Sequence, residues 1–229
     1  MGFHGTHSRK IGKKCIERTS LQLHFDMRPI SYPGTGLIWN NLAYSTTLFG
    51  SSNSMLLVGT TYDNVDGLVF NGSSSYGRLS FKLAYPFTIS VWVMTGVIAT
   101  QLIAGYYSAS DNNPHHDVRF SSNGKIGVFS ETTVGGEKGV DSLISYNRNQ
   151  WYNVVGVFNS VGRSIFVNGK LEGVSNVAVA MSSSLDRFSI GAFDRPAIGV
   201  WVNGKIKNCL VYSRELTATE ILHNYNALK

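Results

Sequence analysis

The chain alternates between short apolar stretches and polar turns, without long runs of either kind. In residues 21–25, LQLHF, apolar and polar side chains alternate as they do in a strand with one buried face. Residues 88–94 repeat this pattern, because Ile89, Val91 and Val93 point to the side opposite Trp92. Similar segments recur from residue 67 to residue 212, so we expect at least about ten antiparallel strands.

Turn signals separate these segments. Four Asn-Gly pairs, which suit tight hairpin turns, stand at Asn71-Gly72, Asn123-Gly124, Asn168-Gly169 and Asn203-Gly204. Two prolines and two glycines break any regular element within residues 27–36, and residues 40–54 are rich in Ser, Thr and Asn and are expected to form a loop. Many short strands joined in this way predict an all-β sandwich, most simply a jelly roll.

One helix is expected, at the C-terminal end of the sequence. Thr217 and Glu220 have the spacing of a capping box, in which each side chain binds the backbone amide of the other. Ile221, Leu222 and Tyr225 then supply an apolar side. We expect this short helix to lie against one edge of the sandwich.

Composition and the two cysteines narrow the class of protein. Hydrophobic residues make up 43% of the 229 residues, enough for a substantial core, whereas charged residues make up only 15%. No apolar run approaches the roughly 18 residues that span a bilayer, and the first residues lack the apolar core of a secretory signal. Cys15 and Cys209 are too few for a disulfide framework or a zinc site, so we expect reduced thiols, with Cys209 packed on a strand.

Most of the formal net charge of +6 lies in residues 1–20, a predicted basic N-terminal arm that precedes one domain of residues 21–229. The arm carries a single acid, Glu17, against five basic residues: Arg9, Lys10, Lys13, Lys14 and Arg18. The arm is either a solvated tail or a segment that docks on an acidic partner protein. Nucleic acid is an unlikely partner, because Phe3 is the only aromatic residue of the arm.

Six segments taken in order resemble the laminin G-like, concanavalin A-like jelly-roll family. They are GLVFNGSSSYGRL, FTISVWV, WYNVVGVFN, SIFVNGKLEG, the closing stretch GKIKNCLVYSRELTATEILHNY, and the lead-in LQLHFDMRPISYPGTGLIWNNL, which resembles lead-ins found in tailed-phage virion proteins. The resemblance covers residues 21–229. It implies a concanavalin A-like sandwich with a short C-terminal helix, in a family that includes sugar-binding domains, adhesins, virion surface proteins and, more distantly, glycosidases.

No pattern supports catalysis, so we expect a protein that is not an enzyme. The Glu-x-Asp-x-Glu strand of glycosidases on this sandwich is missing, and Glu131 and Glu137 stand six residues apart across a Gly-Gly loop. No Gly-x-Ser-x-Gly elbow occurs either.

No metal or other cofactor is expected. The calcium that the family often carries is disfavoured, because the Phe-Asp-Gly-x-x-Asp-Tyr segment reads Phe70-Asn-Gly-Ser-Ser-Ser-Tyr76 here and lacks both carboxylates. Asp26, Asp63 and Asp66 are expected to cap turns.

The most distinctive polar stretch is residues 106–120, which combine aromatic, amide, imidazole and carboxylate groups. Such groups together can bind a sugar, so the stretch and one further tryptophan form a candidate glycan site: Tyr106, Tyr107, Asn112, His115, His116, Asp117 and Trp201. A polar loop without a ligand is the alternative. The adjacent His115 and His116 should point to opposite faces of a strand, which argues against a joint metal site.

The leading functional hypothesis is a virion surface or structural protein, decorating a capsid or associated with a tail, that assembles as a homo-oligomer with other virion proteins. A carbohydrate-binding module or adhesin is the alternative, with glycan as the partner. The first hypothesis places the protein in the virion, and the second places it outside the cell or at its surface. Neither requires a membrane-spanning segment.

Overall fold

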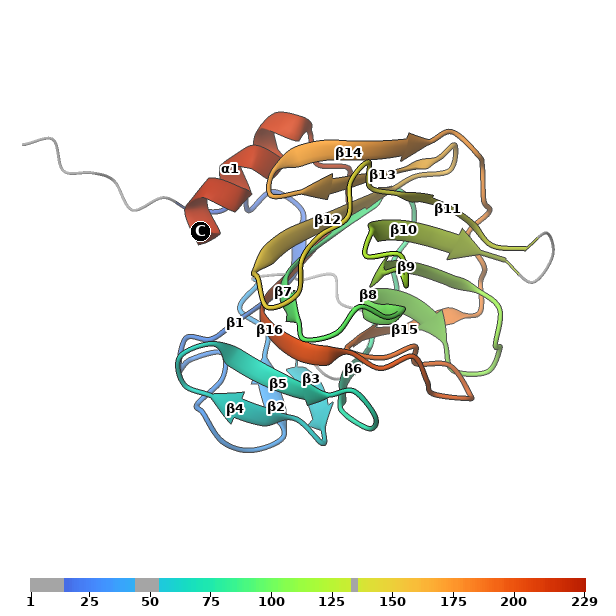
Figure 1. The fold of residues 1–229 in the computed structure, drawn as a ribbon. Coiled ribbons are helices and arrows are strands. Elements are labelled where there is room, and N and C mark those ends of the chain that lie inside the picture. The colour runs from blue at the N-terminus through green and yellow to red at the C-terminus, as the bar shows by residue number, and fades with distance from the viewer. Residues whose placement is uncertain (1–14, 44–53, 133–135) are drawn as a thin grey trace, which may run out of the picture.

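Two antiparallel sheets stack face to face in the computed structural model, with one helix at the outside of the stack (Figure 1). The structure describes residues 15–43, 54–132 and 136–229, and the statements below concern those ranges. The predicted fold class is confirmed, with sixteen strands and the C-terminal helix α1 (Ala218–Leu228). The predicted loop of residues 40–54 begins at Asn40, the last residue of β2, and ends at Ser54, the first residue of β3. Residues 44–53 of this loop lie outside the described residues.

Sheet A contains eight strands, which in spatial order are β14 (Lys170–Ser175), β13 (Arg163–Val167), β12 (Tyr152–Phe158), β7 (Phe87–Thr95), β16 (Asn203–Tyr212), β5 (Gly67–Asn71) and β4 (Thr61–Asp63), with β1 (Leu21–Asp26) also paired to β16. Sheet B contains eight strands, which in spatial order are β11 (Lys138–Asp141), β10 (Ile126–Glu131), β9 (His115–Phe120), β8 (Gln101–Ser108), β15 (Leu185–Ile190), β6 (Tyr76–Ser80), β3 (Ser54–Val58) and β2 (Ile38–Asn40).

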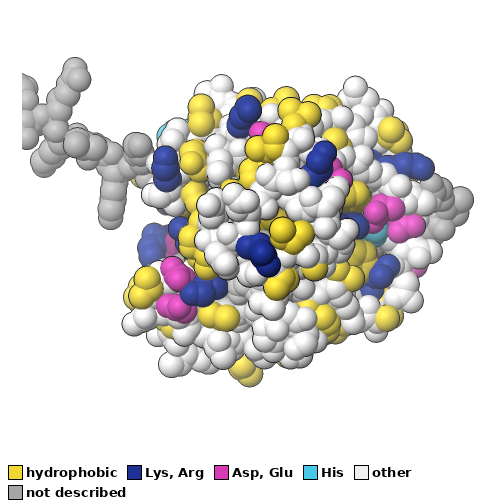
Figure 2. Space-filling view, in the orientation of Figure 1, with side chains coloured by type: hydrophobic (Ala, Val, Ile, Leu, Met, Phe, Trp, Pro, Cys, Tyr) yellow, Lys and Arg dark blue, Asp and Glu magenta, His cyan; other side chains and the backbone are white. Residues whose placement is uncertain are grey.

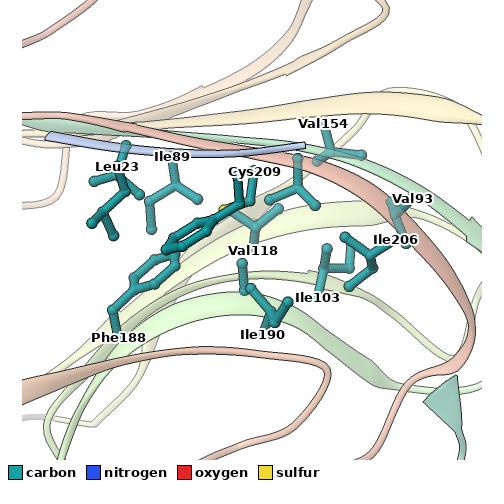
Figure 3. Close-up of a cluster of buried hydrophobic side chains, with 14 of the residues drawn as sticks. Leu23, Ile89, Val93, Ile103, Val118, Val154, Phe188, Ile190, Ile206 and Cys209 are labelled. Carbon is teal, nitrogen blue, oxygen red and sulfur yellow. The ribbon is translucent and has the colours of Figure 1, made fainter. Parts of the chain in front are cut away.

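The main core lies between the sheets, where alternate residues of each strand point inward. Figure 3 shows members of this core from both sheets, among them Ile89 and Cys209 of sheet A and Val118 and Phe188 of sheet B. Cys209 is fully buried, as predicted, and burial raises the pKa of its thiol. The alternation in the sequence therefore identified the inward side of these strands correctly.

Two of the four Asn-Gly pairs form the predicted hairpins. Asn123-Gly124 joins β9 to β10, and Asn168-Gly169 joins β13 to β14 with φ of 51° and 80°, as a type I′ turn requires. The other two predictions were wrong. Asn71-Gly72 leads from β5 in sheet A to β6 in sheet B, where Gly72 has a φ of 77°, because a loop between the sheets needs the same backbone freedom as a hairpin. Asn203-Gly204 begins β16, and Gly204 is required there because the Met94 carbonyl leaves no room for a Cβ.

Sheet A is covered on its outer face as well, by α1 and the segment that precedes β1. Thr217 caps α1 with the predicted capping box. A second apolar cluster beneath the helix contains Ile16, Leu210 and Ile221. Residues 15–19, predicted as part of the arm, thus pack on the domain, whereas Arg9, Lys10, Lys13 and Lys14 lie outside the described residues.

Two tryptophans with apolar neighbours in the sequence, Trp92 and Trp151, lie outside the main core. Trp92 is buried, but it points to the outer face of sheet A and stacks on Tyr225 of α1 with ring centroids 5.7 Å apart. Trp151 is only half-buried, and Lys207 Nζ lies 4.7 Å from its ring. The sequence did not distinguish the two faces of sheet A, because both are covered.

On the face that Figure 2 shows, charged side chains form small groups of both signs among largely uncharged residues. Within the described ranges, no helix is long and apolar enough to cross a membrane.

A buried hydrogen-bond group ties the chain ends together. Tyr212 Oη donates to the Glu17 carbonyl at 2.9 Å and accepts from Asn224 Nδ2 at 3.0 Å, while the Glu17 amide donates to Asn224 Oδ1 at 2.7 Å. We expect Tyr212→Phe to lower the free energy of unfolding by about 1–3 kcal/mol, because it leaves two buried polar groups unpaired. Urea denaturation checks this. Tyr225→Phe is the control, since no hydrogen bond of its hydroxyl is recorded, and equal effects of the two variants would contradict the prediction.

Candidate functional site

The residues of the predicted glycan loop separate to the two faces of sheet B. Strand β9 begins at His115, so His115 and Asp117 point outward and His116 points into the core. The opposite orientation of the two histidines is thereby confirmed. The strand parity was not evident from the sequence, because residues 111–117 read as a continuous polar loop.

Tyr106 and His116 belong to the interior and do not face a surface ligand. Tyr106 Oη donates to the Leu185 carbonyl at 2.8 Å, and burial raises its pKa to about 12. His116 lies among aromatic rings, with Nδ1 2.8 Å from Ser130 Oγ. Burial lowers the pKa of His116 to about 3, so it is neutral at pH 7. Including them in the glycan site was therefore wrong.

The outward residues join an ion-pair network on sheet B. Arg119 clamps Asp117 with two hydrogen bonds of 2.8 and 2.9 Å, and it also donates to Glu137. His115 Nδ1 donates to the Asn113 carbonyl at 2.8 Å, while Nε2 lies 3.0 Å from Glu137 Oε1. These groups satisfy one another, which leaves few hydrogen-bonding positions for a ligand.

A loop after β15 covers part of this network. Phe193 packs on Tyr107 and on His115, with ring centroids 5.0 and 4.9 Å apart. Arg195 lies over the Phe193 ring and donates to the Asn112 carbonyl, which ties the two loops together. Tyr107 is therefore fully buried, and burial raises its pKa.

Trp201 lies elsewhere on the same face of the sheet. Its ring contacts Tyr76 at a centroid distance of 5.9 Å, on strand β6, with β8 and β15 between it and β9. The structure thus brings Tyr107, Asn112, His115 and Asp117 together and leaves Trp201 apart. Their role in glycan binding stays a prediction.

One group within this network has the composition of a metal site. The group consists of His115, Glu131 and Glu137. Each of these side chains has a nitrogen or oxygen atom that could bind a metal ion, and the three atoms lie within 4.8 Å of one another. The guanidinium of Arg119 lies beside them, however, with Nη2 3.2 Å from His115 Nε2. A metal ion would compete with a cation that the protein itself supplies.

The predicted turn-capping aspartates behave largely as expected. Asp63 Oδ1 accepts from the Val65 amide at 2.9 Å, and Asp26 Oδ1 accepts from the Arg28 amide at 3.0 Å. Asp66 instead contributes its carboxylate to Lys205, at 2.7 Å. At Asn71, the side-chain oxygen accepts from backbone amides of the turn that follows it, an arrangement that needs no ion.

A hollow of about 500 Å³ lies elsewhere, between β1 and α1. We call it the β1–α1 hollow, and its lining residues are Cys15, Ile16, Arg18, His24, Asp26, Arg28, Ala227 and Leu228. Four further hollows measure about 190 to 230 Å³. The β1–α1 hollow falls within the size range of small-molecule sites, about 300–1,000 Å³.

His24 is the central polar group of this hollow. It follows Leu23 and precedes Phe25, both core residues, so strand alternation points it outward. The ring is only 5% exposed, and neither ring nitrogen has a partner of hydrogen-bonding geometry, although Nε2 lies 3.2 Å from Asp26 Oδ2. Buried polar groups are normally paired, so these nitrogens require a partner from solvent or from a ligand.

Asp26 and the two arginines complete the polar wall. Arg28 Nε donates to Asp26 Oδ2 at 2.6 Å. Burial raises the pKa of Asp26, but the His24 ring 3.2 Å away and the hydrogen bonds from Arg28 outweigh it, so the pKa lies below its ordinary value of 3.8. Arg18 is exposed, and within the described ranges its guanidinium has no recorded partner. Sequence analysis missed His24 and Arg28, because an outward polar residue on a strand usually faces only water.

The comparisons agree with this fold. The family profile described as Concanavalin A-like lectin/glucanases superfamily matches residues 45–222. A sialidase of Trypanosoma rangeli in complex with the inhibitor DANA has a TM-score of 0.64 at 16% identity, over 89% of this chain and 32% of that chain. No curated protein sequence matches the chain.

Two botulinum neurotoxin structures are also similar. The binding domain of neurotoxin DC in complex with SialylT has a TM-score of 0.67 at 14% identity, over 92% of this chain and 52% of that chain. The receptor binding domain of the C/D mosaic serotype has a TM-score of 0.66 at 13% identity, over 90% and 51% of the two chains. The chain thus spans a third to a half of these proteins, and the likeness establishes the fold alone.

The network on sheet B predicts a specific pH dependence. Burial raises the pKa of Glu137, but the hydrogen bond from His115 and the attraction of Arg119 outweigh it and bring the pKa to about 2, below the ordinary 4.5. Its stabilising contribution is therefore present above about pH 4.5 and is lost as the pH falls toward 2. Glu137→Gln should lower stability at pH 7 by at most about 1 kcal/mol, since the side chain is 37% exposed, and by less at pH 3.

Thermal denaturation at both pH values measures this difference. Glu215→Gln is the control, because Glu215 is exposed and forms no recorded ion pair in the described part of the chain. A deficit of Glu137→Gln that is as large at pH 3 as at pH 7 would contradict the assigned ion pair.

Proposed function

Because this chain belongs to the concanavalin A-like lectin/glucanases superfamily, we propose that it is a non-enzymatic carbohydrate-binding domain and that the β1–α1 hollow receives the sugar. The observation that carries the proposal is the buried His24 ring in that hollow, whose Nδ1 has no partner and whose Nε2 has only the Asp26 carboxylate, 3.2 Å away. A sugar hydroxyl both donates and accepts, so it can pair Nδ1 whichever tautomer His24 adopts.

The rest of the wall suits the same ligand. Ile16, Ala227 and Leu228 supply apolar surface for the carbon-bound hydrogens of a sugar ring, and Asp26 and Arg28 supply planar polar groups for its hydroxyls. The walls come from β1, the segment before it and α1, which the Tyr212 hydrogen bonds hold together. The site is thus formed before a ligand arrives, which reduces the entropic cost of binding.

The similar structures support the ligand class without assigning it. One is a sialidase that holds the inhibitor DANA, and another is a binding domain that holds SialylT. Both cases describe those proteins, and this chain matches only part of each.

The network on sheet B is the other location at which a glycan could bind, around Asn112, Glu137 and Arg195. We place the sugar in the β1–α1 hollow because that hollow offers about 500 Å³ and because the charged groups on sheet B already bind one another. Tyr107 Oη and Arg195 Nε on sheet B also lack partners, but Tyr107 is fully buried beneath Phe193. A ligand at sheet B would have to break existing ion pairs, and the free energy lost with them would offset the free energy gained from its own contacts.

A role in a virion or similar assembly is a second proposal. The lead-in that resembles those of phage proteins is integral to the domain, since Trp39 is fully buried, contacts Phe25 and donates from Nε1 to the Asp26 carbonyl at 2.8 Å. Light scattering tests it: a defined oligomer of the purified chain supports assembly, and a monomer at all concentrations counts against it.

A truncation that tests the arm should remove only residues 1–14, because Glu17 is bonded to the domain.

Filling the hollow should abolish glycan binding. On a glycan array, Ala227→Trp is expected to lose the signals of the wild-type chain, because the indole would occupy the space beside Leu228. Asn226→Trp is the matched control, as it adds the same side chain at an exposed neighbouring position of α1. An array signal that survives Ala227→Trp would place the sugar elsewhere.

Replacing the imidazole tests the hydrogen bonds separately from the space. His24→Leu keeps a side chain of similar size but removes both ring nitrogens, so we expect at least a tenfold weaker Kd, the worth of one or two hydrogen bonds. Because the ring has only one polar contact, with Asp26, and Leu fills a similar volume, the variant should unfold close to the wild-type temperature. Unchanged affinity with an intact fold would contradict the role of His24.

A further inference from the structure

A second hollow continues the first around the end of α1. It measures about 190 Å³ and is lined by Met27, Val65, Asp66, Lys207, Asn208 and Leu228. Leu228 lines both hollows, and Met27 directly precedes Arg28 of the first. The two therefore adjoin across one side chain and offer room for more than one sugar ring.

The second hollow also holds an unsatisfied buried group. Asn208 is 5% exposed, and its side-chain oxygen makes no hydrogen bond. It lies on the outer face of β16, one residue from Lys207 and paired across the sheet with Trp92. Together with His24, this gives two buried side chains with unused hydrogen-bonding atoms along one path.

Cations outnumber available anions along this path. Arg18 has no recorded partner in the described ranges, and Arg28 uses Nε for Asp26 while its terminal nitrogens make no recorded bond. Lys207 is held over the rings of Trp92 and Trp151, each 4.7 Å from Nζ. The two acids are already engaged, Asp26 by Arg28 and Asp66 by Lys205.

From this arrangement we infer that the two hollows bind a short acidic oligosaccharide, with a carboxylate of one sugar held by Arg18 and Arg28 and an adjoining sugar near Lys207 and Asn208. The inference rests on the proposed function and specifies its ligand class. A planar carboxylate matches the paired N–H groups of a guanidinium, which makes arginine its favoured partner. The hydroxyls of the same sugar would reach His24, and the aliphatic Leu228 would contact the ring between the two ends.

Calorimetric titration of the full chain with trigalacturonic acid tests the inference, and the methyl ester of the same trisaccharide is the matched neutral ligand. The acid should bind at least about tenfold more tightly than the ester at equal ionic strength, the worth of one charge-assisted hydrogen bond. Arg18→Gln and Arg28→Gln should each remove most of that difference. Arg148→Gln, at an exposed position of the loop before β12, should leave it unchanged.

Each other outcome overturns the inference in a different way. Equal binding of acid and ester would refute the preference for an anion while leaving the proposed sugar site in place. A preference for the acid that survives both arginine variants would refute the assignment to these hollows. If neither trisaccharide binds, the acidic ligand class is refuted. The glycan array with Ala227→Trp would then test the proposed function with neutral glycans. Arg18→Gln keeps the test valid if Arg28→Gln perturbs Asp26, because Arg18 is exposed.

Discussion

The antiparallel pairing of β1 with β16 is the contact on which the fold and the candidate site both depend. Its register sets Phe25 opposite Cys209 and Leu23 opposite Val211, so that all four side chains enter the core. The same register forces His24 to the outer face of sheet A, next to the helix that follows β16. Because the paired strands lie nearly two hundred residues apart, the hollow forms only when the whole domain has closed.

Local patterns in the sequence were sufficient for the class of fold. The alternation in residues 21–25 and 88–94 predicted β1 and β7, and the Thr217–Glu220 spacing predicted the capping box of α1. Pairing between distant strands was beyond local patterns, which is why Asn71-Gly72 was taken for a hairpin although it connects two sheets. An Asn-Gly pair can form a hairpin within one sheet or a turn that crosses from one sheet to the other.

The candidate site was less predictable, because it depends on side-chain parity and on contacts between distant segments. If β9 is placed one residue out of register, His115 and His116 exchange faces, so that the inward histidine becomes the outward one. The two polar regions of the molecule also differ in a property that no sequence pattern shows. On sheet B, the charges of Asp117, Arg119 and Glu137 neutralise one another, whereas His24 Nδ1 and Asn208 Oδ1 are unpaired beside a hollow. Tyr107 Oη and Arg195 Nε are unpaired on sheet B as well, so the two regions differ in their charge balance and in the space beside them.

The central claim is that a sugar occupies the β1–α1 hollow, and a crystal structure of the chain with a glycan selected from the array tests it most directly. The account predicts electron density for the sugar between β1 and the C-terminal turn of α1, with hydroxyls within hydrogen-bonding distance of the His24 ring nitrogens. Density for the glycan on the outer face of sheet B, with the β1–α1 hollow holding only water, would contradict it.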